Sequence, residues 1–169
     1  MEIKNLKFET NIYTTTIKLN KKFLSLFEDM FLQEREDNKN NYYKKEFSDK
    51  IKEQDICDYI SPAITKIVKG KFRLDSWWVQ RYGPGDFHKI HTHGAAPNLK
   101  SFVLYLNCSK DSSKIVFYQP GYPLLEEQKP HYVTPHKGLL IVFPSYIPHQ
   151  VLRNNDNERL ILSGNIYHE

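Results

Sequence analysis

The sequence predicts a mainly β fold, an antiparallel two-sheet barrel with helices laid against one of its sheets. Residues 17–36 carry apolar side chains at helical spacing, whereas from about residue 75 short runs rich in β-branched and aromatic residues follow one another. No helical pattern separates these runs, which favours a sandwich or barrel over a βαβ fold. The 169 residues fit one domain, with 1–74 as a helical support region and 75–169 as the β core.

The helical region begins with an amphipathic stripe that we expect to pack against the barrel. Its members are Leu19, Phe23, Leu24, Phe27, Met30 and Phe31. A polar loop rich in Asn and Lys follows over residues 37–50. A second helix is expected to begin near residue 61, because Ser61 suits an N-cap, Pro62 suits the first helical position and Gly70 suits the end.

The β core is expected to contain strands separated by Gly, Pro, Asn and Asp. The segments are 76–82 (SWWVQRY), 101–107 (SFVLYLN), 114–120 (KIVFYQP), 138–144 (GLLIVFP) and 159–167 (RLILSGNIY). The helices are expected to support this barrel, so the chemistry should belong to the strands and their loops.

Composition excludes several classes of function. The net charge of +4 is spread over both halves of the chain, so no basic stripe indicates nucleic-acid binding. Cys57 and Cys108 are isolated, which fits free thiols in a reducing, cytoplasmic compartment (the host cytoplasm for a phage protein). The N-terminus has no apolar signal region, and no apolar run is long enough to span a membrane.

Two histidines in the segment YGPGDFHKIHTHG (82–94) are the first candidates for chemistry. On a strand, residues two apart face the same side, so His91 and His93 can chelate one metal ion. A third ligand would come from another strand, and His149 qualifies because it follows the apolar strand 138–144 and a turn bounded by Pro144 and Pro148. By itself the HxH pair is weak, because histidines on strands are usually structural.

Arg159 begins the last expected strand, where an arginine at a strand end is usually a surface residue. The other possibility is an arginine directed inward that pairs with the carboxylate of a bound acid through two hydrogen bonds. Together with three candidate ligands, the inward orientation is the better interpretation.

These residues resemble the 2-oxoglutarate/Fe(II) oxygenases, in particular their prolyl-hydroxylase-like branch. Tyr82, Gly85 and His91 keep that branch's spacing before the first iron ligand, and GLLIVFPSYIPHQV resembles the strand that carries the distal ligand. The resemblance covers about residues 76–168 and implies a double-stranded β-helix (jelly-roll, cupin-like) fold. It implies that His91, His93 and His149 are the metal-binding catalytic residues. Arg159 and Tyr105 would hold the far carboxylate of 2-oxoglutarate, with Tyr82 lining the pocket.

His93 departs from the usual pattern, in which the second ligand is aspartate. A group of similar oxygenases, including phage and marine bacterial proteins, also has HxH. Replacing a carboxylate by imidazole removes one negative charge beside the metal and changes its redox behaviour. Zinc, copper or nickel would also suit such a site.

The cupins are a second resemblance. Gly85, His91 and His93 fit their first motif, and Gly138, Pro144 and His149 fit part of their second. The cupin glutamate after HxH is absent, since Pro97 and Asn98 stand there, and Tyr146 replaces a glycine. This resemblance implies a metal-dependent dioxygenase or isomerase without 2-oxoglutarate, and a non-catalytic barrel that binds a partner is a third possibility.

The oxygenase resemblance implies Fe(II) as cofactor, 2-oxoglutarate and O2 as cosubstrates, and hydroxylation of a small-molecule or peptidyl substrate that the residues do not identify. Loops 94–100 and 119–129 are expected to flank the mouth of the barrel, the second as a substrate lid. A monomer and a homodimer are both compatible with the sequence.

Overall fold

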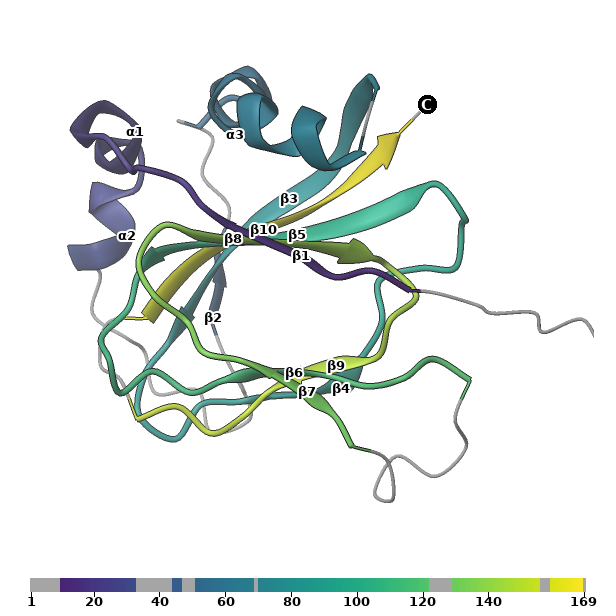
Figure 1. The fold of residues 1–169 in the computed structure, drawn as a ribbon. Helices are drawn as coiled ribbons and strands as arrows, with labels where there is room; N and C mark the ends of the chain where they lie inside the picture. Colours follow the sequence, from purple (N-terminus) through teal and green to yellow (C-terminus); the bar gives the residue numbers. More distant parts are fainter. Residues whose placement is uncertain are drawn as a thin grey trace, which may run out of the picture.

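Two antiparallel sheets face each other in the computed structural model, which describes residues 10–32, 44–46, 51–68, 70–121, 129–155 and 159–168 (Figure 1). The larger sheet has the strand order β1-β8-β5-β10-β3-β2 and the smaller one β4-β9-β6-β7. The strands are β1 (Tyr13–Thr16), β2 (Lys44–Glu46), β3 (Phe72–Tyr82), β4 (His88–His91), β5 (Leu99–Asn107), β6 (Ile115–Phe117), β7 (His131–Val133), β8 (Leu139–Pro144), β9 (His149–Val151) and β10 (Arg159–His168). This arrangement confirms the expected double-stranded β-helix.

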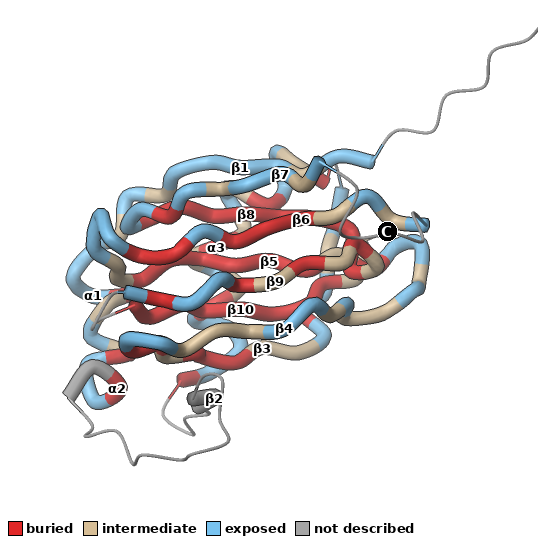
Figure 2. Tube along the Cα trace, turned by 90° about the horizontal axis from the view of Figure 1, so that it is seen from below, coloured by how far each residue is buried: buried red, intermediate tan, exposed pale blue. Residues whose placement is uncertain are grey.

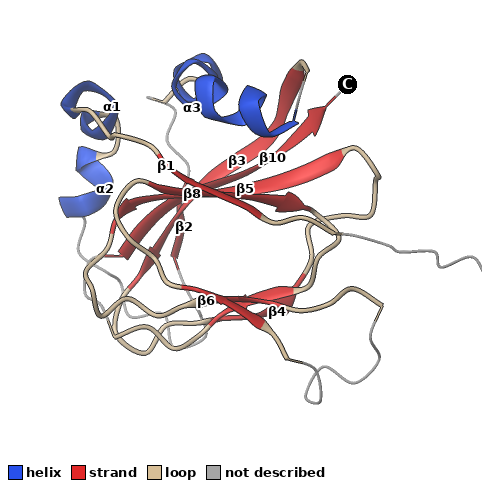
Figure 3. Cartoon of the chain, in the orientation of Figure 1, coloured by secondary structure: helices blue, strands red, loops and turns tan. Residues whose placement is uncertain are grey.

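Three helices, α1 (Lys21–Ser25), α2 (Glu28–Leu32) and α3 (Glu53–Val68), lie on the outer side of the larger sheet (Figure 3). Asn20 caps α1 by accepting a hydrogen bond from the backbone N–H of Phe23 at 2.8 Å. The stripe expected over residues 17–36 is divided between α1 and α2 by a turn at residues 26–27, and Phe23, Phe27 and Met30 are buried. The side chain of Phe31 lies outside the described part of the structure.

The expected start of the second helix at Ser61 is wrong, because α3 begins eight residues earlier, at Glu53. Its first turn is closed by Asp55, whose carboxylate accepts a hydrogen bond from the backbone N–H of Lys52 at 3.3 Å. Pro62 therefore lies inside the helix. The apolar residues Ile56, Ile60, Ile64 and Val68 bury one face of α3, and that packing outweighs the hydrogen bond lost at Pro62. Gly70 follows the helix end, as expected.

The five expected strands are present, and the described residues form five more. β1 and β2 belong to the region expected to be helical, yet both join the larger sheet, pairing with β8 and β3. The rest of the polar loop 37–50 lies outside the described residues. β4, β7 and β9 are only three or four residues long, which is too short for a clear alternating pattern.

Two hydrophobic cores lie on opposite faces of the larger sheet. Its central strands β8, β5 and β10 are buried along much of their length (Figure 2). Alternate residues of each strand face the helices, for example Leu104 of β5 and Leu162 of β10, and are packed against α1–α3. Their neighbours, such as Tyr105 and Ile161, face the interior between the two sheets. The helices thus stabilise the barrel from outside and leave the interior to β-strand side chains. None of the described helices combines the length and the hydropathy needed to span a bilayer.

Candidate active site

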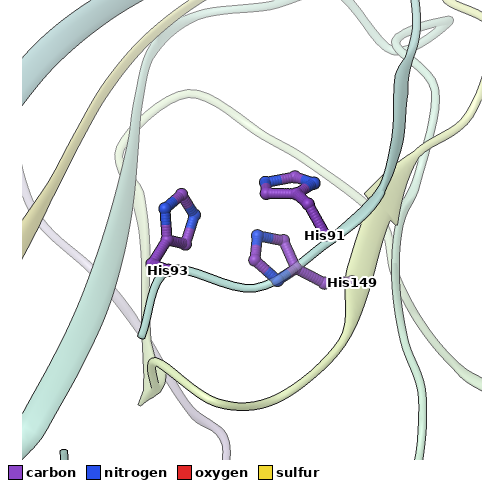
Figure 4. A group of neighbouring side chains, drawn as sticks. All are labelled: His91, His93 and His149. Atoms are coloured by element: carbon purple, nitrogen blue, oxygen red, sulfur yellow. The ribbon is translucent and has the colours of Figure 1, made fainter. Parts of the chain in front are cut away.

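Three histidine side chains converge at one end of the space between the sheets (Figure 4). His91 is the last residue of β4 and His149 the first residue of β9, and these two residues are directly paired across the small sheet. The ring centroids of His91 and His149 are 4.2 Å apart, those of His91 and His93 5.0 Å, and those of His93 and His149 5.1 Å. One ring nitrogen of each lies within 4.8 Å of the others, which is suitable for binding a single metal ion.

His93 reaches this cluster from a position that differs from the expected one. β4 ends at His91, so His93 lies in a bend after the strand, and strand alternation does not explain its orientation. Its backbone N–H donates a hydrogen bond to the carbonyl of Ser145 at 2.9 Å. Ser145 is fully buried, and its hydroxyl is 2.8 Å from that of Ser101, which donates to Asn165 at 2.8 Å. A buried polar network of the larger sheet therefore holds the backbone of His93.

Hydrogen bonds determine which ring nitrogen is available in two of the histidines. The Nδ1 of His91 lies 2.7 Å from the carbonyl oxygen of Lys89, and that of His149 lies 3.0 Å from the carbonyl oxygen of Ile147. A proton on Nδ1 satisfies each contact and leaves the lone pair of Nε2 for a metal. Burial lowers the pKa of His91, and burial followed by the neighbouring His91 lowers the pKa of His149 well below its usual value. Both rings are thus neutral at neutral pH, the form that binds a metal.

Arg159 is buried inside the barrel, as the inward interpretation expects, with 1% of its surface exposed. Its Nη1 donates hydrogen bonds to the carbonyl and the hydroxyl of Ser113 at 2.8 and 2.9 Å, and its Nη2 donates to the Tyr105 hydroxyl at 3.1 Å. Its Nε has no hydrogen-bond partner, and no carboxylate of the described residues pairs with the guanidinium. A buried cation of this kind is costly unless an anion reaches it.

The two candidate tyrosines lie against this arginine. The guanidinium carbon of Arg159 is 4.7 Å from the ring centroid of Tyr82 and 5.1 Å from that of Tyr105. Burial raises the pKa of Tyr105, while Arg159 acts in the opposite direction. Its hydroxyl therefore stays protonated at neutral pH, so that it can accept from Arg159 and donate to a ligand.

A single cavity connects the histidine cluster with the arginine. It contains about 310 Å³ of space not filled by protein atoms, open solvent included, of which a water-sized sphere reaches about 20 Å³. It is lined by Trp78, Gln80, Tyr82, His88, His91, His93, Val103, Ile115, His149, Val151, Arg159, Ile161 and Ser163. The strands thus bring together residues that are 68 positions apart in the sequence, from His91 to Arg159.

Several residues in and beside this cavity were not expected from the sequence. His88 stacks on His91 with a centroid distance of 3.7 Å, and Ser113 holds Arg159. Trp78 and Gln80 lie on β3 four and two residues before Tyr82. Ser163 lies on β10 four residues after Arg159. Strand alternation was the available signal, since residues two or four apart share a face.

The expected loops are only partly described. Residues 92–98 connect β4 to β5, so the expected loop 94–100 ends earlier than expected, because β5 already begins at Leu99. In the loop 119–129, residues 122–128 lie outside the described part of the structure, so the expected lid stays a prediction.

The donor set fits the groups that the resemblance implies. Three imidazoles with ring nitrogens within 4.8 Å of one another suit a divalent transition metal. One end of the same cavity presents a buried guanidinium without a carboxylate partner among the described residues. A dicarboxylic acid that chelates the metal at one end could meet this cation at the other.

The chain matches the family model of the 2OG-Fe(II) oxygenases over residues 76–165, more than half of its length. In sequence it has no significant match among curated proteins. Solved structures share its fold at low identity. A prolyl-4-hydroxylase from Pseudomonas putida is 21% identical, with coverage of 95% of this chain and 94% of that one and a TM-score of 0.61.

Two further structures were determined with 2-oxoglutarate. The viral collagen prolyl hydroxylase from Paramecium Bursaria Chlorella virus-1 is 16% identical, covers 94% of this chain and 96% of its own, and has a TM-score of 0.60. HygX from Streptomyces hygroscopicus, with nickel, 2-oxoglutarate and hygromycin B bound, is 12% identical, with 94% and 83% coverage and a TM-score of 0.70. The family match decides against the cupin and non-catalytic interpretations: the chain belongs to the 2-oxoglutarate- and Fe(II)-dependent oxygenases.

Proposed function

We propose that His91, His93 and His149 hold the Fe(II) of this oxygenase, and that Arg159, Tyr105 and Tyr82 form the far end of its 2-oxoglutarate site. The observation that carries the proposal is that the three imidazoles and the buried guanidinium line the same cavity. With both groups bound, iron, 2-oxoglutarate and O2 would supply the oxidising chemistry: one oxygen atom of O2 would end in the succinate formed as 2-oxoglutarate loses CO2, and the other would be transferred to the substrate.

Each residue has a separate task in this proposal. The carbonyls of Lys89 and Ile147 orient two of the imidazoles, and the backbone of Ser145 holds the third. Ser113 fixes the guanidinium of Arg159 so that its remaining donors can meet a carboxylate. The hydroxyl of Tyr105 would donate a hydrogen bond to the same carboxylate. The ring of Tyr82 covers one face of the guanidinium.

A melting experiment tests the proposal. Metal-stripped protein would be heated with Mn(II), which replaces Fe(II) without reacting with oxygen, in the presence and absence of 2-oxoglutarate. A ligand at about 100 times its dissociation constant adds about 2.7 kcal/mol, or roughly 5–10 °C for a chain of this size. We expect this shift to require both metal and 2-oxoglutarate and to be lost in Arg159→Ala.

The matched control is Arg73→Ala, because Arg73 is an exposed arginine near the start of β3 and its side chain pairs with Asp75. It should keep the full shift. An equal shift in Arg159→Ala and wild type would contradict the assigned cosubstrate site, and no shift with Mn(II) and 2-oxoglutarate together would contradict the proposed site as a whole.

A further inference from the structure

Gln80 lies midway along the wall that β3 contributes to the cavity. Trp78, Gln80 and Tyr82 occupy every second position of the strand, so they share one face, and all three line the cavity. The Trp78 ring is 5.4 Å from the His93 ring, and the Tyr82 ring lies 4.7 Å from the guanidinium carbon of Arg159. Gln80 is therefore placed between the histidine end and the arginine end of the cavity.

The amide of Gln80 is buried, with only 4% of the residue exposed, and is hydrogen-bonded on one side. The Ser163 hydroxyl, on the neighbouring strand β10, donates a hydrogen bond to its Oε1 at 3.2 Å. Within the described part of the chain, its Nε2 makes no hydrogen bond. The two N–H groups of this amide belong to a residue that lines the cavity between its two ends, so they are placed to donate to an oxygen of a ligand bound there.

The remaining lining limits what that ligand oxygen can be. Arg159 is the only lysine or arginine among the described lining residues, and it lies at one end. Val103, Ile115, Val151 and Ile161 offer no polar group. A dicarboxylate with one carboxylate paired to Arg159 has its second acid group towards the histidines, and imidazole side chains bring no negative charge that would compete with it.

We propose that Gln80 is part of the 2-oxoglutarate site, where its amide N–H groups donate to an oxygen of the keto-acid end, with Ser163 as the residue that orients the amide. This inference rests on the proposed function of the site. An uncharged donor suits this position, because it stabilises the acid oxygen without competing with the metal for it.

Anaerobic titration of the Fe(II)-loaded protein with 2-oxoglutarate tests the inference. The visible charge-transfer band of the chelate gives the dissociation constant, and its energy reports hydrogen bonding to the chelating oxygen atoms. Gln80→Met keeps the size of the side chain but removes the donors, and Gln80→Glu puts a carboxylate beside the ligand's own. We expect binding to weaken about tenfold or more in Gln80→Met, with a displaced band, and further in Gln80→Glu.

Two controls separate this role from a loss of folding. Gln54→Leu, on the exposed side of α3, should bind as the wild type does. The melting temperature and Mn(II) affinity of each Gln80 variant, measured without 2-oxoglutarate, report whether the barrel and the histidine site are intact.

The outcomes distinguish the two proposals. If Arg159→Ala loses 2-oxoglutarate while Gln80→Met binds it with unchanged affinity and an unchanged band, the role of Gln80 is refuted and the proposed site stands. If wild-type protein forms no chelate band, or Arg159→Ala keeps it at full affinity, the proposed site itself fails, and the role of Gln80 fails with it.

Discussion

At the scale of single residues, His93 is the proposed metal ligand that differs most from the usual pattern of the family, which has aspartate at this position. His93→Ala leaves two imidazoles, and we expect the affinity for Mn(II) to fall at least a hundredfold, about 2.7 kcal/mol or more. Isothermal titration of the metal-stripped variant measures it. His131→Ala is the control, since His131 is exposed on the edge strand β7, and it should keep the wild-type affinity. An undiminished affinity in His93→Ala would mean that His93 is not a ligand.

The proposed role of Tyr105 depends on its hydroxyl group. Its hydroxyl is fully buried, stays protonated and contacts Arg159. Tyr105→Phe keeps the ring and removes the donor, so 2-oxoglutarate should bind to the Mn(II) protein about tenfold more weakly, the value of one hydrogen bond to a charged group. Calorimetric titration checks this, with Tyr132→Phe on the exposed side of β7 as control. Equal affinities in Tyr105→Phe and wild type would assign the hydroxyl to packing alone.

At the scale of elements, two glycines set the entry points of strands. Gly85 has a φ of +83° in the turn between β3 and β4, where its N–H donates to the carbonyl of Asn154 at 2.7 Å. Gly138 has a φ of +84° before β8. It accepts a hydrogen bond from Ile17 and donates one to Tyr105, each at 2.8 Å. Gly85 and Gly138 therefore stand at fixed distances before His91 and His149 because the turns that lead into these segments need a residue with positive φ.

Gly138→Ala tests this geometry. A Cβ at Gly138 would lie 2.3 Å from the carbonyl oxygen of Ile17, whereas a Cβ at Gly121, with φ +80°, would meet nothing within 4 Å. Both alanine variants carry the backbone strain of about 1–2 kcal/mol, but only Gly138→Ala adds a clash with backbone. In urea denaturation we expect Gly138→Ala to lose more unfolding free energy than Gly121→Ala by about 1 kcal/mol or more. Equal losses would show that the loop before β8 adjusts.

At the scale of the whole molecule, the helix-side core and the cavity of the candidate site lie on opposite faces of the larger sheet. The helices pack on one face and the cavity lies against the other. Ile60 of α3 is fully buried in the helix-side core. Ile60→Ala should lower the unfolding free energy by about 2–5 kcal/mol and leave the 2-oxoglutarate affinity of the folded Mn(II) protein unchanged. Denaturation and calorimetry below the melting temperature measure both. A parallel loss of affinity would mean that the two faces are coupled.

The sequence by itself determined what local patterns encode. Short runs rich in β-branched and aromatic residues predicted five of the strands. The motifs around His91, His149 and Arg159, with the family resemblance that they carry, predicted the candidate site, because each motif lies within one segment and can be read without the rest of the chain. Only the tertiary structure decided how those segments meet. In the structure α3 begins at Glu53, although Pro62 favours a later start, and β1 and β2 belong to the larger sheet. The hydrogen bond between the backbones of His93 and Ser145 holds His93 beside the other two histidines. It also placed Gln80 and Ser163 together. These outcomes depend on burial and on contacts between residues far apart in sequence, whose free energies exceed the local propensities of the segments involved.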